Sequence, residues 1–465
     1  MKKKILLLSD DLRIPSGIGT MSKSFVINSL KDFDWVQMAG AVKHPETGKT
    51  IDMSQVFAKE TGVVDASVIL YGVDGYGNQD ILRAVIEREK PDAILHFTDP
   101  RFWGWLYDME HEIRQHTPIM YYNIWDDLPY PHWNENSYES CDMLMAISQQ
   151  TYNINNQVCV RKPRKGKDLT YVQHGVEELT FKPLAKDNPE LVELKKRLFG
   201  DKEYDYVALF NSRNILRKHP ADLISAFNSF ALSIPADLRD KTALVLHTDI
   251  VDQAGTDLNV VANRLAGDSN VIFSTGKLEP YQLNYLYNIA DVVCNPSSAE
   301  GFGLSHMEGM MSGTPTIATV VGGLQDQMGF KIAGKEMTVQ HFTGEIPSNS
   351  TGKISKEHGE WTYPLWPQLN LQGSPTTPYI YDSRASIEQI EQGIKYWYEM
   401  PKEERTSCGL KGREWAIKNG FTGDGMCKAA VDSIDQCFKN FKPRDKYVVI
   451  DTKAKTPKNK KGILI

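Results

Sequence analysis

The sequence predicts an α/β protein made of two Rossmann-like domains, each built on a doubly wound parallel sheet. A length of 465 residues exceeds the usual size of one domain and favours two. Short apolar runs alternate with helix-like segments along two separate stretches of the chain. Brief buried strands joined by longer helical connections are typical of parallel sheets that helices cover.

The first stretch indicates an N-terminal domain over residues 1–184. We expect its short apolar runs to be strands, because the connections between them are long enough to hold helices. The segment Lys182-Pro-Leu and the charged, helix-prone residues after it, as far as Phe199, are interpreted as the link to the next domain. The expected strands cover residues 4–9, 35–42, 93–97, 119–124, 143–147 and 170–172.

The second stretch indicates a C-terminal domain over residues 185–422. Residues from about 330 to 377 break its pattern with Gly, Pro, Ser and Trp, and they exceed the length of a normal loop, which predicts an insertion. A helix at 423–441 and a basic tail at 442–465 end the chain. The expected strands cover residues 206–211, 243–247, 270–273, 292–295 and 316–319, and the expected helices before the last cover 221–233, 280–289, 385–398 and 402–419.

Composition is that of an ordinary globular protein, and it excludes several classes. No apolar run approaches the roughly 20 residues of a membrane helix, and the apolar run after Lys4 is too short for a signal peptide. The six cysteines form no Cys-x-x-Cys pair, so we expect a cytoplasmic protein without structural zinc. A net charge of -6 argues against a wholly basic nucleic-acid coat.

The sharpest motif is the segment 295–308, in which Glu300 and Glu308 stand eight positions apart around a Gly-Phe-Gly turn. If a helix begins near Gly303, its free amides face a ligand. Glu308 inside that helix can accept both hydroxyls of a ribose, and Glu300 on the preceding loop can reach a sugar ring. The alternative is a strand, turn and helix whose two acids are solvated.

A second motif, Asn211-Ser-Arg-Asn-Ile-Leu-Arg-Lys-His-Pro, places Arg213 and Lys218 five residues apart between a strand and a helix. A diphosphate leaving group gains negative charge as its bond to a sugar breaks, and fixed cations stabilise that transition state. Arg213 and Lys218 suit this role. The neighbouring Arg217 and His219 are interpreted as a solvated face.

In order and spacing, these motifs resemble the C-terminal half of glycosyltransferase family four. The resemblance covers about residues 206–326 and is looser in the N-terminal half. It implies the GT-B fold, in which two Rossmann-like domains face each other across a cleft, and retaining sugar transfer from a nucleotide-sugar without metal or cofactor. Further matching segments are Gly276, 290–297, Gly313-Thr-Pro, Gly322-Gly, Gly17-Ile-Gly, Ala146-Ile-Ser and His174-Gly-Val-Glu.

The resemblance also implies roles for single residues. Arg213 and Lys218 would hold the diphosphate, Glu308 the ribose and Glu300 the transferred sugar, and the carrier expected from the family is uridine diphosphate. The helix after Gly423 would pack on the N-terminal domain. The other expected donor contacts are Gly17, Gly19, Gly276, Lys277, Leu278, Phe302, Gly303 and Leu304.

For the acceptor side we expect Asp126 as a catalytic residue, Asp127 as a binding residue and His96 as a weaker candidate, each at a predicted strand end. Trp125 stands where the family often has histidine. The leaving phosphate itself could therefore take the acceptor's proton.

Two basic segments bear on the acceptor: Arg161 to Lys167, and the tail from Lys439. They favour 5-hydroxymethylcytosine in bacteriophage DNA, modified in the host cytoplasm. A cell-surface polysaccharide or lipid-linked acceptor is the alternative. A different class of function is the further alternative: an epimerase or a non-catalytic nucleotide-sugar binding protein. The sequence leaves the oligomeric state open.

Overall fold

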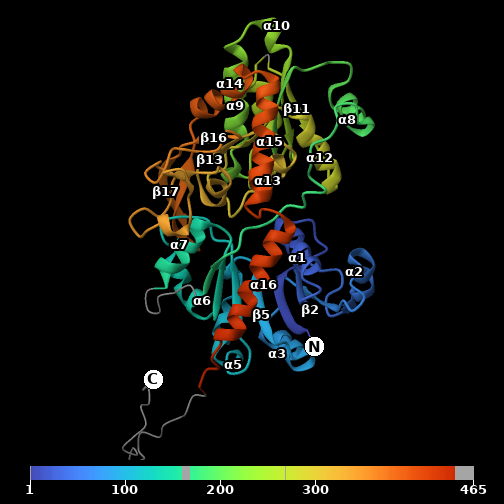
Figure 1. Cartoon of the computed structure of the whole chain (residues 1–465), viewed down its shortest axis with the longest axis vertical. Coiled ribbons are helices and arrows are strands. Elements are labelled where there is room, and N and C mark those ends of the chain that lie inside the picture. The colour runs from blue at the N-terminus through green and yellow to red at the C-terminus, as the bar shows by residue number, and fades with distance from the viewer. Residues whose placement is uncertain (1, 160–167, 268, 446–465) are drawn as a thin grey trace, which may run out of the picture.

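Two sheets organise the chain, one in each lobe of an elongated molecule (Figure 1). The computed structural model describes residues 2–159, 168–267 and 269–445. The first sheet has eight strands and the second has six, and buried helices pack on them. The prediction of an α/β protein with two Rossmann-like domains is therefore confirmed.

All neighbouring strands in the two large sheets are parallel, except β3 and β4. In sheet order, the first sheet contains β3 (Thr50–Asp52), β4 (Val68–Asp74), β2 (Phe33–Ala41), β1 (Lys3–Asp10), β5 (Ala93–Phe97), β6 (Ile119–Asn123), β7 (Met143–Ala146) and β8 (Leu169–Tyr171). The second contains β11 (Val271–Ser274), β10 (Thr242–His247), β9 (Tyr206–Asn211), β12 (Val292–Asn295), β13 (Thr316–Thr319) and β16 (Thr362–Leu365).

Helices connect the strands, and none in the described ranges is both long and apolar enough to cross a membrane. Those before residue 170 are α1 (Gly17–Asn28), α2 (Ser54–Thr61), α3 (Gln79–Glu89), α4 (Gly104–Asp108), α5 (Glu110–Ile113), α6 (Glu135–Glu139) and α7 (Gln149–Val158). Later ones are α8 (Pro189–Phe199), α9 (Pro220–Leu232), α10 (Ala236–Arg239), α11 (Leu258–Leu265), α12 (Pro280–Ile289), α13 (Leu304–Met311), α14 (Ile387–Glu399), α15 (Lys402–Lys418) and α16 (Gly423–Asn440). The 3₁₀ turns are η1 (Pro100–Phe102), η2 (His132–Asn134), η3 (Leu216–Lys218), η4 (Gly322–Gln327) and η5 (Val339–His341).

Strand β1 shows why an unbroken apolar run forms a central strand. Ile5 and Leu7 belong to the core that includes α1 and α16, whereas Leu6 and Leu8 belong to the core that includes α3 and α4. Both faces of the strand are buried, so alternation of polar and apolar residues is absent. Packing on both faces fixes the position of β1, and its carboxyl end points to the cleft between the domains.

The expected insertion at about 330–377 is wrong in part, because the segment contributes β16 to the second sheet. Proline in this short strand hid it from the sequence analysis, but an edge position tolerates proline. Strand β4 was missed because Tyr71 and Gly72 interrupt its apolar run. The remaining irregular region holds two small antiparallel pairs, β14 (Lys331–Ile332) with β15 (Lys335–Glu336), and β17 (Gln368–Ser374) with β18 (Thr377–Arg384).

The hairpin β17–β18 reaches across to the N-terminal domain. The Tyr381 amide donates to the carbonyl of Leu128 at 2.6 Å, and the Tyr379 hydroxyl donates to the carbonyl of Tyr130 at 3.2 Å. The Tyr379 ring also meets Trp133 edge-on, with 4.6 Å between centroids. The hairpin belongs to the second domain and thus packs against residues of the first domain.

A second contact between the domains joins η4 to α7. Asp326 accepts a hydrogen bond from the Gln149 amide at 2.8 Å and another from the Tyr171 hydroxyl at 3.1 Å. Gln149 is the first residue of α7, whose amide has no partner within the helix. A side chain of the second domain therefore accepts a hydrogen bond from the free first amide of a helix in the first domain.

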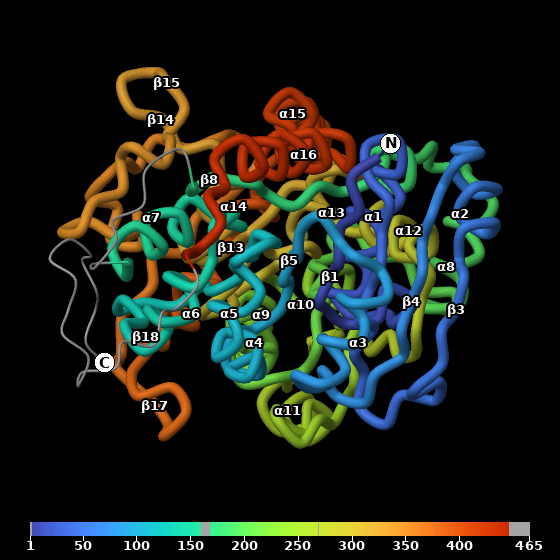
Figure 2. The backbone as a smooth tube through the Cα atoms, turned by 90° about the horizontal axis from the view of Figure 1, so that it is seen from below, coloured from blue at the N-terminus to red at the C-terminus, as the bar shows by residue number. Residues whose placement is uncertain are grey.

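The last helix crosses back to the first domain, where α16 packs against α1 and β7 (Figure 2). At the crossing, the Val176 amide donates to the carbonyl of Phe421 at 3.0 Å. A Cβ on Gly175 would lie 1.9 Å from the carbonyl oxygen of Thr422. Glycine at this position lets the two backbones meet.

We predict that Gly175→Ala destabilises the protein by about 1–3 kcal/mol, because the added methyl group overpacks the crossing. Urea unfolding measures the change. Gly104→Ala is the matched control, since a Cβ there meets no heavy atom within 4 Å. Equal stability of the two variants would contradict the account of the crossing.

Candidate functional site

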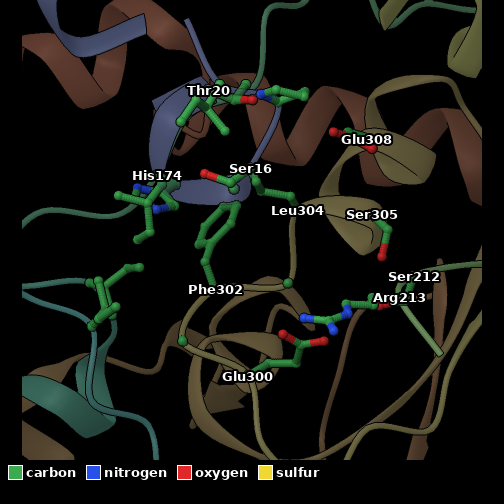
Figure 3. A pocket seen from close by; sticks show the side chains of 18 of the residues that line it. Ser16, Thr20, His174, Ser212, Arg213, Glu300, Phe302, Leu304, Ser305 and Glu308 are labelled. Carbon is green, nitrogen blue, oxygen red and sulfur yellow. The ribbon is translucent and has the colours of Figure 1, made fainter. Parts of the chain in front are cut away.

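A cavity of about 1330 Å³ lies between the two domains. Residues that follow β1, β6, β9 and β12 line it, so the carboxyl ends of both sheets open onto the same space. Figure 3 shows Ser16 and Thr20 on one side of the pocket and Arg213 and Glu300 on the other. The cavity is large enough for two substrates to meet.

The centre of the cavity wall is a buried ion cluster around Glu300. The Lys218 ammonium contacts one carboxylate oxygen, and the Arg217 guanidinium lies 3.6 Å from the other. Ser297 donates a third contact at 3.0 Å. Burial opposes ionisation of Glu300, but Lys218 and Arg217 outweigh it and lower the pKa to about 2. Glu300 is therefore a carboxylate at neutral pH.

Glu308 is held quite differently, one turn inside α13. The Tyr287 hydroxyl donates to its carboxyl group at 2.5 Å, and the Asn211 side chain donates to the Tyr287 oxygen at 2.7 Å. Burial raises the pKa of Glu308 to about 7, although the hydrogen bond from Tyr287 opposes this shift. A carboxyl group without a cation beside it is suited to accept hydrogen bonds from neutral hydroxyls.

The structure gives the two expected diphosphate cations different partners. Lys218 is buried against Glu300, whereas Arg213 donates to Asp252 at 2.7 Å and keeps 66% of its side chain exposed. Both line the cavity. The sequence analysis missed Arg217, which also lines the cavity and contacts Glu300, and the expectation of a merely solvated Arg217 is wrong.

The loop before α13 depends on glycine. Gly303 has a φ of 91°, and a Cβ there would lie 2.4 Å from Leu324. No side chain caps the helix, and its first two residues, Leu304 and Ser305, line the cavity. Unpaired amides at this end are suited to an anionic or hydroxyl ligand.

Most of the expected donor contacts line the cavity. Gly17 comes from the facing domain, and a Cβ on it would lie 4.0 Å from the Leu304 side chain. Gly19 and Gly276 are not among the lining residues, and Gly19 is required instead by its own loop, since a Cβ would lie 2.3 Å from the Ile14 carbonyl. The lining donor residues are Gly17, Lys277, Leu278, Phe302, Gly303, Leu304 and Glu308.

Asp126 and Asp127 lie on the loop after β6 and line the cavity opposite the Glu300 cluster. Burial raises the pKa of both groups, and the charge of Asp126 raises that of Asp127 further, against the attraction of Arg217. No side chain in the described ranges donates a hydrogen bond to either carboxyl group. Adjacent carboxyl groups that line a cavity and whose pKa burial raises are candidates for a functional site.

His96 is a core residue, so its expected contact with the acceptor is wrong. Its ring nitrogens lie 2.7 Å from the Tyr107 hydroxyl and 2.9 Å from the Thr98 hydroxyl. The side chain is fully buried, and burial lowers its pKa to about 3. Its position at a strand end suggested an exposed site, but η1 and α4 cover it.

Two further expectations concern metal and nucleic acid. In the described part of the chain, no group of three His, Cys, Asp or Glu side chains is placed to hold a metal ion. The basic residues from Arg161 to Lys167 and those after residue 445 lie outside the described ranges. The proposed contacts with DNA depend on those segments.

We predict that Glu308→Gln flattens the pH dependence of stability of the unliganded protein. A carboxyl group whose pKa rises on folding stabilises the fold below its unfolded value of 4.5, and this contribution disappears as pH rises towards 7. The wild type should therefore lose on the order of 3 kcal/mol relative to the variant across that range. Thermal unfolding at several pH values measures the difference, and parallel curves would refute the assigned pKa.

Comparisons with known proteins agree with this geometry. Residues 193–334 match the family described as Glycosyl transferases group 1. The D-inositol 3-phosphate glycosyltransferase of Salinispora arenicola is 32% identical over 166 residues, which are 35% of this chain and 37% of that protein. The mannosylfructose-phosphate synthase of Agrobacterium fabrum is 28% identical over 40% of this chain and 39% of its own. The matches thus span less than half the length of these relatives.

Solved structures are similar over nearly the whole chain. Anabaena Alr3699/HepE in complex with UDP and glucose has a TM-score of 0.62 at 14% identity, covering 93% of this chain and 99% of that one. The sucrose-phosphate synthase of Thermosynechococcus elongatus has a TM-score of 0.61 at 16% identity, covering 94% and 100%. The chain therefore has the GT-B fold, and its residues 193–334 are similar to the Glycosyl transferases group 1 family.

Proposed function

We propose that this protein is a retaining glycosyltransferase that moves a sugar from a nucleoside diphosphate to an acceptor hydroxyl. The cluster of Lys218, Arg217 and Glu300, facing Asp126 across the cleft, is the observation that carries the proposal. It combines cations for a leaving diphosphate with a carboxylate that is ionised at neutral pH. The ribose would bind Glu308, and the base would lie near Lys277 and Leu278.

In the proposed reaction, the bond between the sugar's anomeric carbon and the diphosphate oxygen breaks, and its electron pair stays on that oxygen. Lys218 and Arg213 stabilise the charge that develops there. The acceptor hydroxyl forms the new bond from the same face. Its proton passes to the departing phosphate, so no side-chain base is required. Glu300 orients the sugar, and Asp126 orients the acceptor hydroxyl.

Uridine diphosphate is the proposed carrier, supported by the neighbouring structure that holds UDP and glucose. For the acceptor, the sequence favoured 5-hydroxymethylcytosine in phage DNA over surface glycans. Of the basic segments behind that choice, residues 161–167 and those after 445 lie outside the described ranges, so modified DNA enters as one arm of the test. The relatives are named for small phosphorylated acceptors or products, which enter as another arm.

Turnover of uridine, guanosine and adenosine diphosphate sugars tests the proposal, with release of the nucleotide as the readout. Each donor is offered alone, with neutral sugars, with sugar phosphates and with duplex DNA containing 5-hydroxymethylcytosine. Acceptor-dependent release, with product in the donor's anomeric configuration, is expected. Conversion of the donor sugar without any acceptor would instead establish an epimerase, and absence of both binding and turnover would overturn the proposal.

Lys218→Ala should reduce turnover about a hundredfold to a thousandfold, because removing one preorganised charge at a transition state has that effect. Donor affinity, measured by calorimetry, should change far less. Lys241→Ala is the matched control, since that lysine forms an exposed ion pair with Asp205 outside the cavity. A variant that loses donor affinity but keeps its turnover at saturating donor would show that Lys218 contributes only to ground-state binding.

A further inference from the structure

A second, smaller chamber of about 290 Å³ adjoins the donor cleft. Asp126 and Asp127 line both spaces and are the residues common to their described walls. Most of the chamber wall comes from the irregular segment 344–353 and from the hairpin β17–β18. The irregular segment and the hairpin therefore build most of the chamber, which ends at the carboxyl groups facing Glu300.

The inner wall of the chamber is rich in buried hydroxyl groups. Ser298, Ser348, Ser350 and Ser383 are each at most 9% exposed. For Ser350 and Ser383, no described residue provides a hydrogen-bond partner for the hydroxyl oxygen. Buried hydroxyl groups without protein partners are available to a ligand that both donates and accepts hydrogen bonds.

Among the described lining residues, the chamber offers few basic groups to an anionic ligand. Asp126, Asp127 and Glu345 contribute three carboxyl groups, whereas Lys353 is the single cation among the described lining residues. Both Glu345 and Lys353 are exposed at the rim. Leu128, Val321 and Tyr381 supply apolar surface inside. A neutral ring with several hydroxyl groups matches this combination of apolar surface, serines and carboxylates.

The hairpin also ties the chamber to the donor site. Asp382 on β18 lies 3.5 Å from the His219 ring, next to Lys218 in the chain, and Arg384 forms two hydrogen bonds with Asp222, at 2.7 and 2.6 Å. Its outer part is bonded to Leu128, two residues after Asp126. One rigid element thus fixes the chamber relative to both reacting partners.

We infer that this chamber is the acceptor site, and that its occupant is an uncharged, polyhydroxylated unit of about one sugar ring. The inference rests on the proposed glycosyl transfer and names its acceptor class. A hydroxyl of the occupant would reach Asp126 and Asp127 at the junction with the donor cleft. A sugar phosphate or a DNA duplex would find Lys353, at the exposed rim, as the single basic side chain of the described lining to pair with its phosphate.

Saturation-transfer NMR tests the assignment with the full chain in the presence of UDP. The probes are methyl glycosides of glucose, mannose, galactose and arabinose, together with glucose 6-phosphate and a duplex containing 5-hydroxymethylcytosine. Signals from at least one neutral glycoside are expected. Leu369→Trp, which narrows the chamber from β17, and Ser350→Trp, which fills it, should weaken those signals and acceptor-dependent turnover on the order of tenfold or more.

Leu371→Trp is the matched control, because it lies on the same strand, is 67% exposed and does not line the chamber. UDP binding should be retained by all three variants, and slow donor hydrolysis should stay unchanged in Leu371→Trp. The assignment is overturned if no neutral glycoside binds, if the phosphate or DNA probe binds instead, or if the filling variants leave glycoside binding intact. Absence of binding of uridine, guanosine and adenosine diphosphates to the wild type would instead refute the proposed function itself.

Discussion

The buried pair of Lys218 and Glu300 is the constraint on which the site depends. Taking two ions out of water costs several kcal/mol for each, and removing one leaves the other uncompensated. Here Arg217 and Ser297 complete the contacts of Glu300, so the cluster is fixed from both the β9 turn and the β12 turn. Hydrophobic residues of the same size could join these turns at lower cost. In the proposed reaction, the charged pair supplies an ionised carboxylate and a cation in fixed places.

The hairpin β17–β18 extends this fixed geometry to the other domain. Its inner end pairs with the residues directly after Lys218, and its outer end bonds to the loop that carries Asp126. Two such domains could move as separate bodies. Because the hairpin contacts both of them, it sets the distance between the cations and the facing carboxyl groups. It also replaces open solvent beside that loop with a wall, which is how the smaller chamber arises.

Sequence alone predicted the two sheets because central strands such as β1 and β12 are unbroken apolar runs, buried on both faces. Motif spacing along the chain also pointed to Glu300, Glu308 and Lys218, and all three line the cavity. The ion-pair partners were not visible in the sequence. Arg213 and Arg217 are both basic residues that follow one strand, and only the folded structure shows that Arg213 pairs with Asp252 and Arg217 with Glu300. His96 failed for the same reason, because a strand end can be covered by elements that follow it.

The Gln149 amide at the start of α7 donates a hydrogen bond to Asp326 in the other domain. Separating the two domains would therefore also weaken the beginning of a helix. If η4 moved away, Gln149 would lose its acceptor, and the first turn of a helix in the other domain would lose part of its capping. Wide opening of the cleft is then a local unfolding event as well as a rigid-body motion. The population of open molecules would follow the stability of that helix end, so the rate at which substrates enter could change through residues that never touch them.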